Sequence, residues 1–398
     1  MSDIKPNRTM VLSLSVNGAG YAPGTGPAAA GIDPPAWLDR NFYKKLAASV
    51  EKAKFDFILI DDLPGFNGYA AEQLTTAASI RPESVSVAGM LVPFTEHVGI
   101  AATIPITFNE PYHISRKLAS LDHLSKGRAA WNIAFNSGDA AERHFGRERL
   151  KGLEEQQEQA EEFLGLTDKL WDSWEDDSLI IDKESGIYAD PDKHHPLQFK
   201  GRYYSVKGAL NVLRPPQGHP IKLTRADSPF GLRFAAEHAD IVFGGAQSID
   251  EAKQANAVVK QVAKAVSVTG DQKLFLLNVM LIQGDTEQEA NRQAKLLEAL
   301  FADSSVNSQG LGIGGWLTVA GTPAQIADEL ERWYLSGSCD GFNFIPPLLP
   351  ESVDAWADGI IRELQIRGLH RTEYEDATLR ERLGLTRPGN QFGREAGQ

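Results

Sequence analysis

Two apolar runs of the sequence end in side chains that can form hydrogen bonds. Asp61 and Asp62 follow the run FDFILI, and Thr103 closes the run VGIAAT. A carboxylate or a hydroxyl at the end of a buried strand can accept a hydrogen bond from a ring N–H or a hydroxyl group of a bound molecule. Local roles remain open as alternatives, because the aspartates can cap the next helix and Thr103 can bond its own backbone.

A third polar strand end lies in the run AAWNIA. Asn132 stands inside this run, and Asn136 and Ser137 follow it closely. An amide donates and accepts hydrogen bonds at the same time, which suits the edge of a heterocycle such as a flavin or a pyrimidine. The structural alternative is a buried asparagine that ties two adjacent strands together.

A fourth polar turn follows the apolar run PIKLT and directly precedes the helical pattern PFGLRFAAEHA. The turn consists of Arg225, Ala226, Asp227 and Ser228. Ser228 would stand at the helix N-terminus, where free backbone N–H groups favour an anion such as a phosphate. The side chain of Asp227 would repel that anion, so its backbone N–H is the expected contact, whereas Arg225 can bind a phosphate in a fork. As a plain helix cap, Ser228 needs no ligand.

Metal-dependent and hydrolytic chemistry is not indicated by the other motifs. The nine histidines form no HxH or HExxH pattern, and no GxSxG pattern occurs, so no metal site is predicted. His113, at the expected mouth of a strand, is a candidate acid–base group because imidazole titrates near neutral pH. Cys339 is the single cysteine, so there is no disulfide framework.

The bulk composition indicates a cytoplasmic enzyme with a small-molecule substrate. A net charge of −13 disfavours nucleic acid and anionic membranes as partners. The N-terminal residues MSDIKPNRTM contain no apolar signal region, and no apolar stretch approaches the length of about 18 residues that indicates a membrane span.

Short apolar runs alternate with amphipathic helical patterns along most of the chain, which indicates a parallel sheet buried on both faces. The runs that we assign to strands cover 11–16, 55–62, 98–103, 129–134, 220–224, 240–245, 273–284 and 341–345. About eight strand–helix units favour a closed (β/α)8 TIM barrel within a single domain, 1–398. No GxGxxG follows the first strand, which weakens a Rossmann fold. In such a barrel the active site lies at the carboxyl ends of the strands.

Two segments do not fit this alternation. Residues 146–219 are too long for an ordinary connection, and we predict an insertion that covers the barrel mouth, with a surface excursion as the alternative. The segment 370–398 has no clear core pattern towards its end, and we expect it to wrap the surface or a neighbouring subunit.

In combination, several longer motifs resemble one known family. They are NEPYHISRKLASLDHLSKGRAAWNIAFNS, KFDFILIDD, PPQGHP, SPFGLRFAAEHADIVF, AGTPAQIADEL and ELQIRGLHRTEYEDATLRERLGL. The chain resembles the bacterial luciferase-like, flavin-dependent monooxygenases, and within them the nitrilotriacetate and dibenzothiophene-sulfone monooxygenase branch. The resemblance extends over about residues 40–390.

The resemblance implies a luciferase-like barrel and a two-component reaction. Reduced FMN would come from a separate NAD(P)H:FMN reductase and would react with O2 through a peroxyflavin. The oxygenated substrate would be a small organic molecule such as an amine, a sulfone or an N-heterocycle, with cleavage of a C–N or C–S bond typical of the branch. The family also implies a homodimer or a homotetramer. A deazaflavin-dependent oxidoreductase and a non-catalytic flavin-binding barrel are the alternatives.

The motif match also implies roles for individual residues. Asp62 matches the family aspartate near the isoalloxazine, Thr103 and Asn132 match positions that line the flavin, and Ser228 with the backbone of Asp227 matches the phosphate turn. The sequence departs from the family at Asp61, where alanine is common. Our candidate catalytic residues are His113, Asn132 and Asp62. The candidate cofactor-binding residues are Asp62, Thr103, Asn132, Asn136, Ser137, Arg225, Ala226, Asp227 and Ser228.

Overall fold

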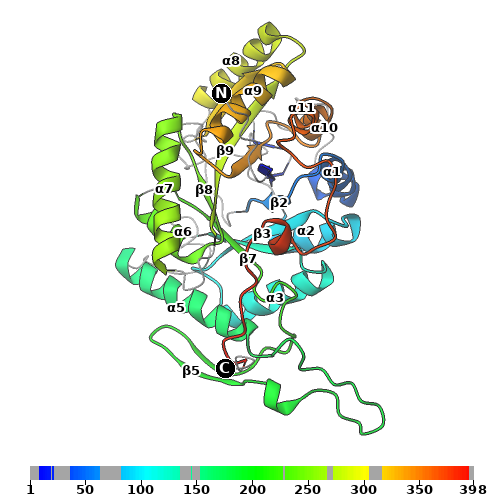
Figure 1. The fold of residues 1–398 in the computed structure, drawn as a ribbon, viewed down its shortest axis with the longest axis vertical. Helices are drawn as coiled ribbons and strands as arrows, with labels where there is room; N and C mark the ends of the chain where they lie inside the picture. Colours follow the sequence, from blue (N-terminus) through cyan, green and yellow to red (C-terminus); the bar gives the residue numbers. More distant parts are fainter. Residues whose placement is uncertain are drawn as a thin grey trace.

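Eight parallel strands close into a barrel in the computed structural model, which confirms the predicted (β/α)8 fold (Figure 1). The model describes residues 9–18, 20–21, 36–62, 82–134, 145, 153–226, 229–266, 272–303 and 316–393. The barrel strands, in spatial order, are β1 (Val11–Val16), β2 (Phe57–Ile60), β3 (Gly99–Pro105), β4 (Ala129–Ala134), β7 (Ile221–Arg225), β8 (Ile241–Gly244), β9 (Leu274–Gln283) and β11 (Gly341–Ile345). Pairing of β8 with β9 and of β11 with β1 closes the circle.

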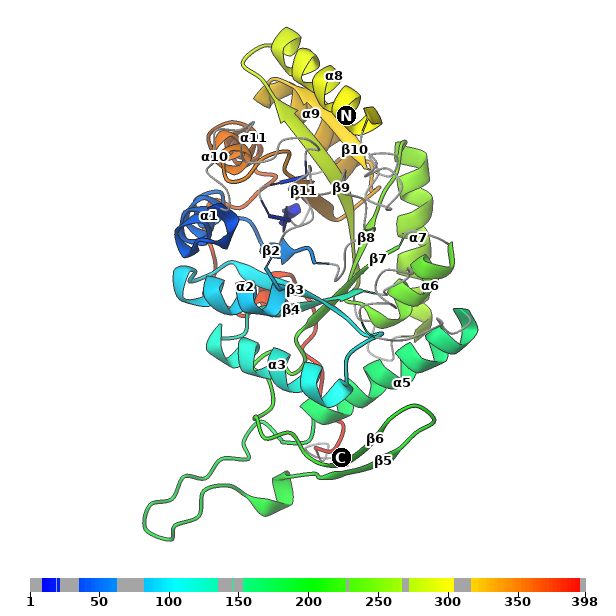
Figure 2. The same cartoon turned by 180° about the vertical axis from the view of Figure 1, so that it is seen from behind.

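Helices cover the outside of this barrel, and Figures 1 and 2 show them as a ring around the strands. They are α1 (Arg40–Lys52), α2 (Ser84–Leu91), α3 (Pro111–Leu124), α5 (Leu153–Trp171), α6 (Pro229–His238), α7 (Ile249–Val266), α8 (Glu287–Asp303), α9 (Pro323–Leu335), α10 (Glu351–Asp358) and α11 (Ile360–Ile366). A further strand, β10 (Leu317–Gly321), extends the sheet beyond β9 and was not predicted from the sequence.

The interior of the barrel changes from apolar to polar along the strand direction. Because alternate residues of a strand face the same side, the inward positions of each strand form successive layers. The lower layers are apolar and include Val11, Phe57, Ala130 and Leu276. The polar residues that the strands also place inside lie further along, towards the carboxyl ends, so the apolar half stabilises the fold and the other end is available for a site.

The amino-terminal end of the barrel is closed by the C-terminal segment of the chain. A short helix, α12 (Leu379–Arg382), places the fully buried Leu379 against the first residue of β3. A Cβ atom at Gly99 would lie 2.5 Å from Leu379 Cδ2, so only glycine leaves room for that leucine. The segment 370–393 therefore differs from the expected surface tail, because part of it completes the barrel core.

The described part of the insertion also lies at this amino-terminal end. Residues 146–152 lie outside the described residues, α5 is a helix of the barrel ring, and 172–219 connects α5 to the start of β7. Gln217 Nε2 donates to the carbonyl oxygen of Ala129, the first residue of β4, at 2.8 Å. The prediction that the insertion covers the mouth is thus wrong for 172–219, because a segment that leads from a helix into a strand begins at the opposite end of the barrel.

Candidate functional site

A cavity lies at the carboxyl ends of the strands, where the barrel architecture places active sites. Its walls combine apolar and aromatic side chains with amide, hydroxyl and charged groups, as ligand sites do. The lining residues are Ser15, Tyr21, Leu59, Asp61, Asn132, Arg225, Phe243, Asn278, Trp316, Asn343 and Ile345.

Asn132 contributes an acceptor to this cavity that has no partner among the described residues. The parallel register places Asn132 beside Thr103, and Asn132 Nδ2 donates to Thr103 Oγ1 at 2.9 Å. Thr103 Oγ1 in turn donates to the carbonyl oxygen of Ile60 at 2.6 Å. Asn132 is only 3% exposed, and its Oδ1 lacks a hydrogen bond within the described part of the chain. Asn132 therefore ties two strands and also keeps one buried acceptor for a ligand.

Thr103 acts through Asn132. It is buried and does not line the cavity, and its hydroxyl donates to the backbone of Ile60 on the neighbouring strand β2, not to its own backbone. Because the same hydroxyl oxygen receives the amide of Asn132, Thr103 fixes which end of that amide faces the cavity. A role in positioning Asn132 is what the described contacts support.

The two consecutive aspartates have different environments. Asp62 Oδ2 accepts a hydrogen bond from the backbone N–H of Ser84, the first residue of α2, at 3.2 Å. Asp61 lines the cavity and its Oδ2 accepts from the Tyr21 hydroxyl at 2.9 Å. Since Leu59 also lines the cavity, the period of two along a strand points Asp61 inward. From the sequence both aspartates were candidates but only Asp62 was assigned to the site, although this alternation was visible in FILIDD.

Tyr21 closes one side of the cavity. Its ring packs edge-on against Trp316, with the ring centroids 5.6 Å apart. Burial raises the pKa of the Tyr21 phenol well above its ordinary value, and the negative charge of Asp61 adds to this effect. The phenol therefore keeps its proton on Oη at neutral pH.

We expect Tyr21 to stay un-ionised while more exposed tyrosines titrate. In an alkaline titration followed by ultraviolet absorbance, the wild-type protein and the Tyr21→Phe variant should show the same phenolate signal up to about pH 10, the ordinary tyrosine pKa. A tyrosinate signal that is lost in Tyr21→Phe below that pH would contradict the buried pair with Asp61.

The floor of the cavity is a network of buried polar side chains from three strands. Asn343 Nδ2 donates to Asn278 Oδ1 at 2.8 Å and to Ser15 Oγ at 2.9 Å, and Ser13 Oγ donates to Asn343 Oδ1 at 2.9 Å. These residues were not predicted from the sequence. The available signal was a polar residue inside an otherwise apolar run, as in GFNFI and LFLLNVML. Their mutual hydrogen bonds give the cavity a rigid polar base.

The other predicted site residues are distributed unevenly. Arg225 lines the cavity, whereas Ala226 is partly buried against the core and donates its N–H to Phe243 O at 2.9 Å. His113 is exposed on α3, beside the ring of Tyr112, and is not among the residues that line the cavity. The remaining predicted residues, Asn136, Ser137, Asp227 and Ser228, lie outside the described residues.

Neither metal ligation nor cysteine chemistry is supported within the described residues. They contain no group of three or more His, Cys, Asp or Glu side chains that could hold a metal ion. Cys339 is buried, and burial raises the pKa of its thiol to about 12, which keeps it from acting as a thiolate. Among the helices of the described ranges, none has the length and apolar character required to cross a membrane.

Comparison with known sequences finds relatives of one kind, since those described below are all named as monooxygenases. The sequence model of the luciferase-like monooxygenases matches residues 14–338. The N-acetyl-S-(2-succino)cysteine monooxygenase of Bacillus subtilis (strain 168) is 31% identical over 90% of this chain and 93% of its own length. Nitrilotriacetate monooxygenase component A of Aminobacter aminovorans is 30% identical over 96% and 98%. The dibenzothiophene-sulfone monooxygenase of Rhodococcus erythropolis is 31% identical over 88% and 91%.

Comparison with solved structures agrees with the sequence relatives. The crystal structure of DmoA from Hyphomicrobium sulfonivorans superposes with a TM-score of 0.85 at 28% identity, covering 94% of this chain and 92% of that one. Fold, cavity position and sequence relatives converge on one assignment: this chain is a member of the luciferase-like monooxygenase family.

Proposed function

We propose that the protein is the oxygenating component of a two-component monooxygenase, with reduced FMN and O2 as co-substrates. The observation that carries this proposal is the buried, unpartnered Oδ1 of Asn132 in the cavity of a luciferase-like barrel. A flavin ring edge offers an N–H group to such an acceptor, and an unmatched buried acceptor costs about 1–3 kcal/mol unless a ligand satisfies it.

The residues of the cavity fit a flavin in chemical character. Leu59, Phe243 and Ile345 give apolar contact for a ring, and Asn132 gives an acceptor for its edge. Arg225 brings a positive charge at the end of β7, which suits the phosphate group of FMN. We also retain Asp62, Asn136, Ser137, Asp227 and Ser228 as proposed cofactor contacts on the basis of the family motif alone.

The protein itself would bind and orient the reduced FMN and the substrate, and it would exclude water from the cavity. Bound reduced FMN supplies the two electrons with which one atom of O2 enters the substrate while the other leaves as water. The hydrogen bonds of Asn343 with Ser15 and Asn278 hold the polar side chains at the floor of the cavity in fixed positions. Tyr21 keeps its proton on Oη and donates it to Asp61 Oδ2, so this pair offers acceptor atoms to the cavity. A separate reductase would supply the reduced FMN; one relative is named component A, which supports this division of labour.

The substrate we propose is a small organic molecule, an amine, a sulfone or an N-heterocycle, and loss of a C–N or C–S bond would follow oxygenation.

The deciding experiment mixes anaerobic protein and reduced FMN with O2 in a stopped-flow spectrometer. We expect flavin re-oxidation to differ from that of free reduced FMN and to accelerate with a substrate. Re-oxidation identical to free FMN, together with no retention of reduced FMN in anaerobic ultrafiltration, would reject the proposal. Hydride transfer from a reduced deazaflavin without O2 would identify a deazaflavin-dependent oxidoreductase. Flavin binding without turnover would identify a non-catalytic flavin-binding barrel.

Substitution of Arg225 distinguishes a contact with the FMN phosphate from a contact with the flavin ring. In Arg225→Gln we expect the Kd for reduced FMN to rise about 10-fold or more, since a charged hydrogen bond to phosphate is worth about 1.5–3 kcal/mol. The Kd for reduced riboflavin, which has no phosphate, should change little. Equal effects on both ligands in anaerobic titrations would show that Arg225 contacts the ring or only supports the cavity.

A further inference from the structure

Asp61 lines the cavity with a carboxylate that the protein satisfies at one oxygen only. Oδ2 accepts the hydrogen bond from the Tyr21 hydroxyl, and the backbone N–H of Asp61 donates to Val16 O on β1 at 2.9 Å. Oδ1 has neither a hydrogen-bond donor nor a cation as a partner among the described residues. The wall of the cavity therefore keeps one charged acceptor for a ligand.

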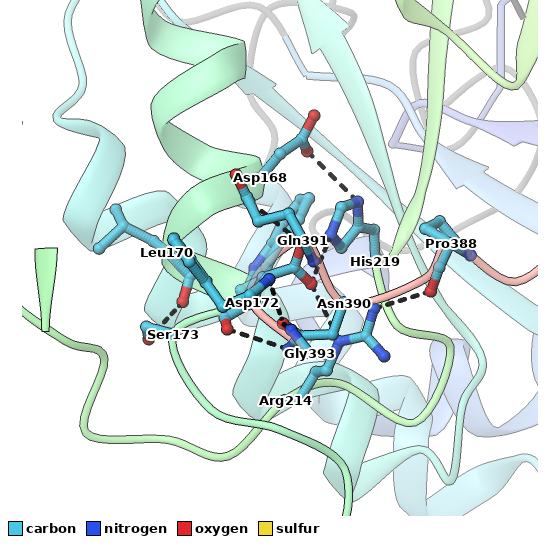
Figure 3. Close-up of polar contacts among 12 residues, drawn as sticks. Asp168, Leu170, Asp172, Ser173, Arg214, His219, Pro388, Asn390, Gln391 and Gly393 are labelled. Carbon is cyan, nitrogen blue, oxygen red and sulfur yellow. Dashed lines mark hydrogen bonds and ion pairs between the residues drawn. The ribbon is translucent and has the colours of Figure 1, made fainter. Parts of the chain in front are cut away.

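The buried carboxylate of Asp172 shows the contrasting, purely structural arrangement. In Figure 3 its Oδ1 lies 2.9 Å from Arg214 Nε and 3.0 Å from His219 Nε2. Its Oδ2 accepts a hydrogen bond from Gln391 Nε2 at 3.1 Å. Both oxygens of Asp172 are thus paired within the protein, as the cost of burying a charge requires. Asp61 departs from this arrangement, and it does so at the cavity.

Aromatic side chains hold Asp61 in place and shape the wall around it. Tyr21 is 8% exposed and Trp316 is 4% exposed, and both rings line the same cavity as Asp61. Tyr21 N donates to Pro346 O at 3.0 Å, so Tyr21 is fixed at its backbone as well as at its hydroxyl. The faces of aromatic rings attract cations. This wall therefore suits a positively charged group better than a neutral one.

The charges of the cavity also favour a cation once FMN is bound. Among the described residues that line the cavity, Asp61 is the single acidic side chain and Arg225 the single basic one, and no ion pair joins the two. A phosphate monoester carries a charge of about −1.5 to −2 at neutral pH, which Arg225 alone does not balance. A positive group beside Asp61 offsets the excess negative charge, whereas a neutral or anionic ligand leaves this carboxylate unpaired and poorly solvated.

We propose that Asp61 determines specificity by selecting substrates that carry a protonated amino group. This selectivity rests on the proposed function and narrows its substrate class to small organic cations with at least one N–H. The N–H of the ammonium group donates to Asp61 Oδ1, and the rings of Tyr21 and Trp316 flank the group. Oδ2 keeps its hydrogen bond with Tyr21, so the acceptor is already oriented before the substrate arrives.

The test compares two pairs of compounds of similar shape and different charge, benzylammonium with benzyl alcohol and butylammonium with 1-butanol. Anaerobic isothermal titration calorimetry of the full chain loaded with reduced FMN measures each Kd at neutral pH. We expect each cation to bind about 10- to 100-fold more tightly than its alcohol, because only the cation forms a charge-assisted hydrogen bond. Equal Kd values within both pairs, or no cation with a Kd below about 10 mM, would overturn the proposal.

The variant Asp61→Asn removes the charge and keeps the size of the side chain and an acceptor for the Tyr21 hydroxyl, so we expect the fold to be unaffected. The preference for the cation should fall to about 2-fold or less, and the Kd for reduced FMN should stay within about 2-fold of wild type. The matched control is Asp172→Asn, which should lower stability and leave the preference intact. A preference that persists in Asp61→Asn contradicts the proposal. An FMN Kd that rises about 10-fold in that variant also contradicts it, because Asp61 is then a cofactor contact.

Binding of reduced FMN by the wild type separates this selectivity from the proposed function. A wild type that does not retain reduced FMN contradicts the monooxygenase proposal, and the same titrations on the flavin-free chain still decide whether Asp61 selects cations. A wild type that binds and re-oxidises FMN as expected but does not prefer the cations contradicts the selectivity alone.

Discussion

Replacing Asn132 by alanine should raise the Kd for reduced FMN about 10- to 100-fold. The substitution removes the acceptor that the barrel leaves unpaired in the cavity, and a buried hydrogen bond of this kind is worth about 1–3 kcal/mol in binding. It also removes the Nδ2 group that donates a hydrogen bond to Thr103 Oγ1 in the wild-type protein. Anaerobic fluorescence titration with reduced FMN measures the effect independently of any substrate.

A matched control separates binding from general destabilisation. Asn256 on α7 is also buried, donates Nδ2 to Gly337 O at 3.1 Å, and has an Oδ1 without a partner among the described residues. It does not line the cavity. Asn256→Ala should therefore lower stability to a similar degree and leave the FMN Kd unchanged. If Asn132→Ala behaves like this control, the assignment of the cavity to the flavin ring edge is wrong.

Removing the guanidinium of Arg380 should lower the free energy of unfolding by about 3–5 kcal/mol. Arg380 lies in α12 and its Nη atoms contact the two carboxylate oxygens of Asp240 at 3.0 and 2.9 Å, while Nη2 also donates to His219 O. Loss of one partner leaves the carboxylate of Asp240 uncompensated in a poorly solvated site. Equilibrium urea unfolding of Arg380→Ala measures this loss.

The control for Arg380 is an ion pair at the surface. Arg332 pairs with Glu329 one helical turn away, and the Arg332 side chain is 61% exposed. Arg332→Ala should change stability far less than Arg380→Ala, because water screens exposed pairs. Similar losses in the two variants would show that α12 and its pair with Asp240 do not contribute specifically to the closed end of the barrel.

The ion pair between Arg380 and Asp240 also makes the stability of the protein sensitive to acid. Burial alone would raise the pKa of Asp240, but the charge and hydrogen bonds of Arg380, with the backbone N–H of Lys222, outweigh it and hold the pKa well below its usual range. A carboxylate with a lowered pKa in the folded state stabilises the protein above its unfolded pKa of about 3.9 and loses that contribution as the pH falls further. Wild type should therefore lose more stability below about pH 4 than Arg380→Ala, whereas parallel pH profiles would contradict this assignment.

The sequence alone determined the barrel and most of its strands. The runs at 11–16, 129–134 and 341–345 coincide with β1, β4 and β11. Buried parallel strands are continuous apolar runs, so they can be recognised from local composition. Polar residues at strand ends likewise pointed to the right end of the barrel, and among them Asn132 and Arg225 line the cavity.

Tertiary structure decided which polar residues share the cavity and what closes the other end. Asp61 and Asp62 are equivalent in a sequence pattern, and only the pleat of β2 and the position of α2 direct one to Tyr21 and the other to Ser84. The packing of Leu379 against Gly99 joins residues 280 positions apart along the chain, from 99 to 379. Such contacts depend on closure of the whole sheet, which local periodicity does not encode. For the same reason the sequence could show that 146–219 is an insertion, but only the order of α5 and β7 in the folded barrel placed 172–219 at the amino-terminal end.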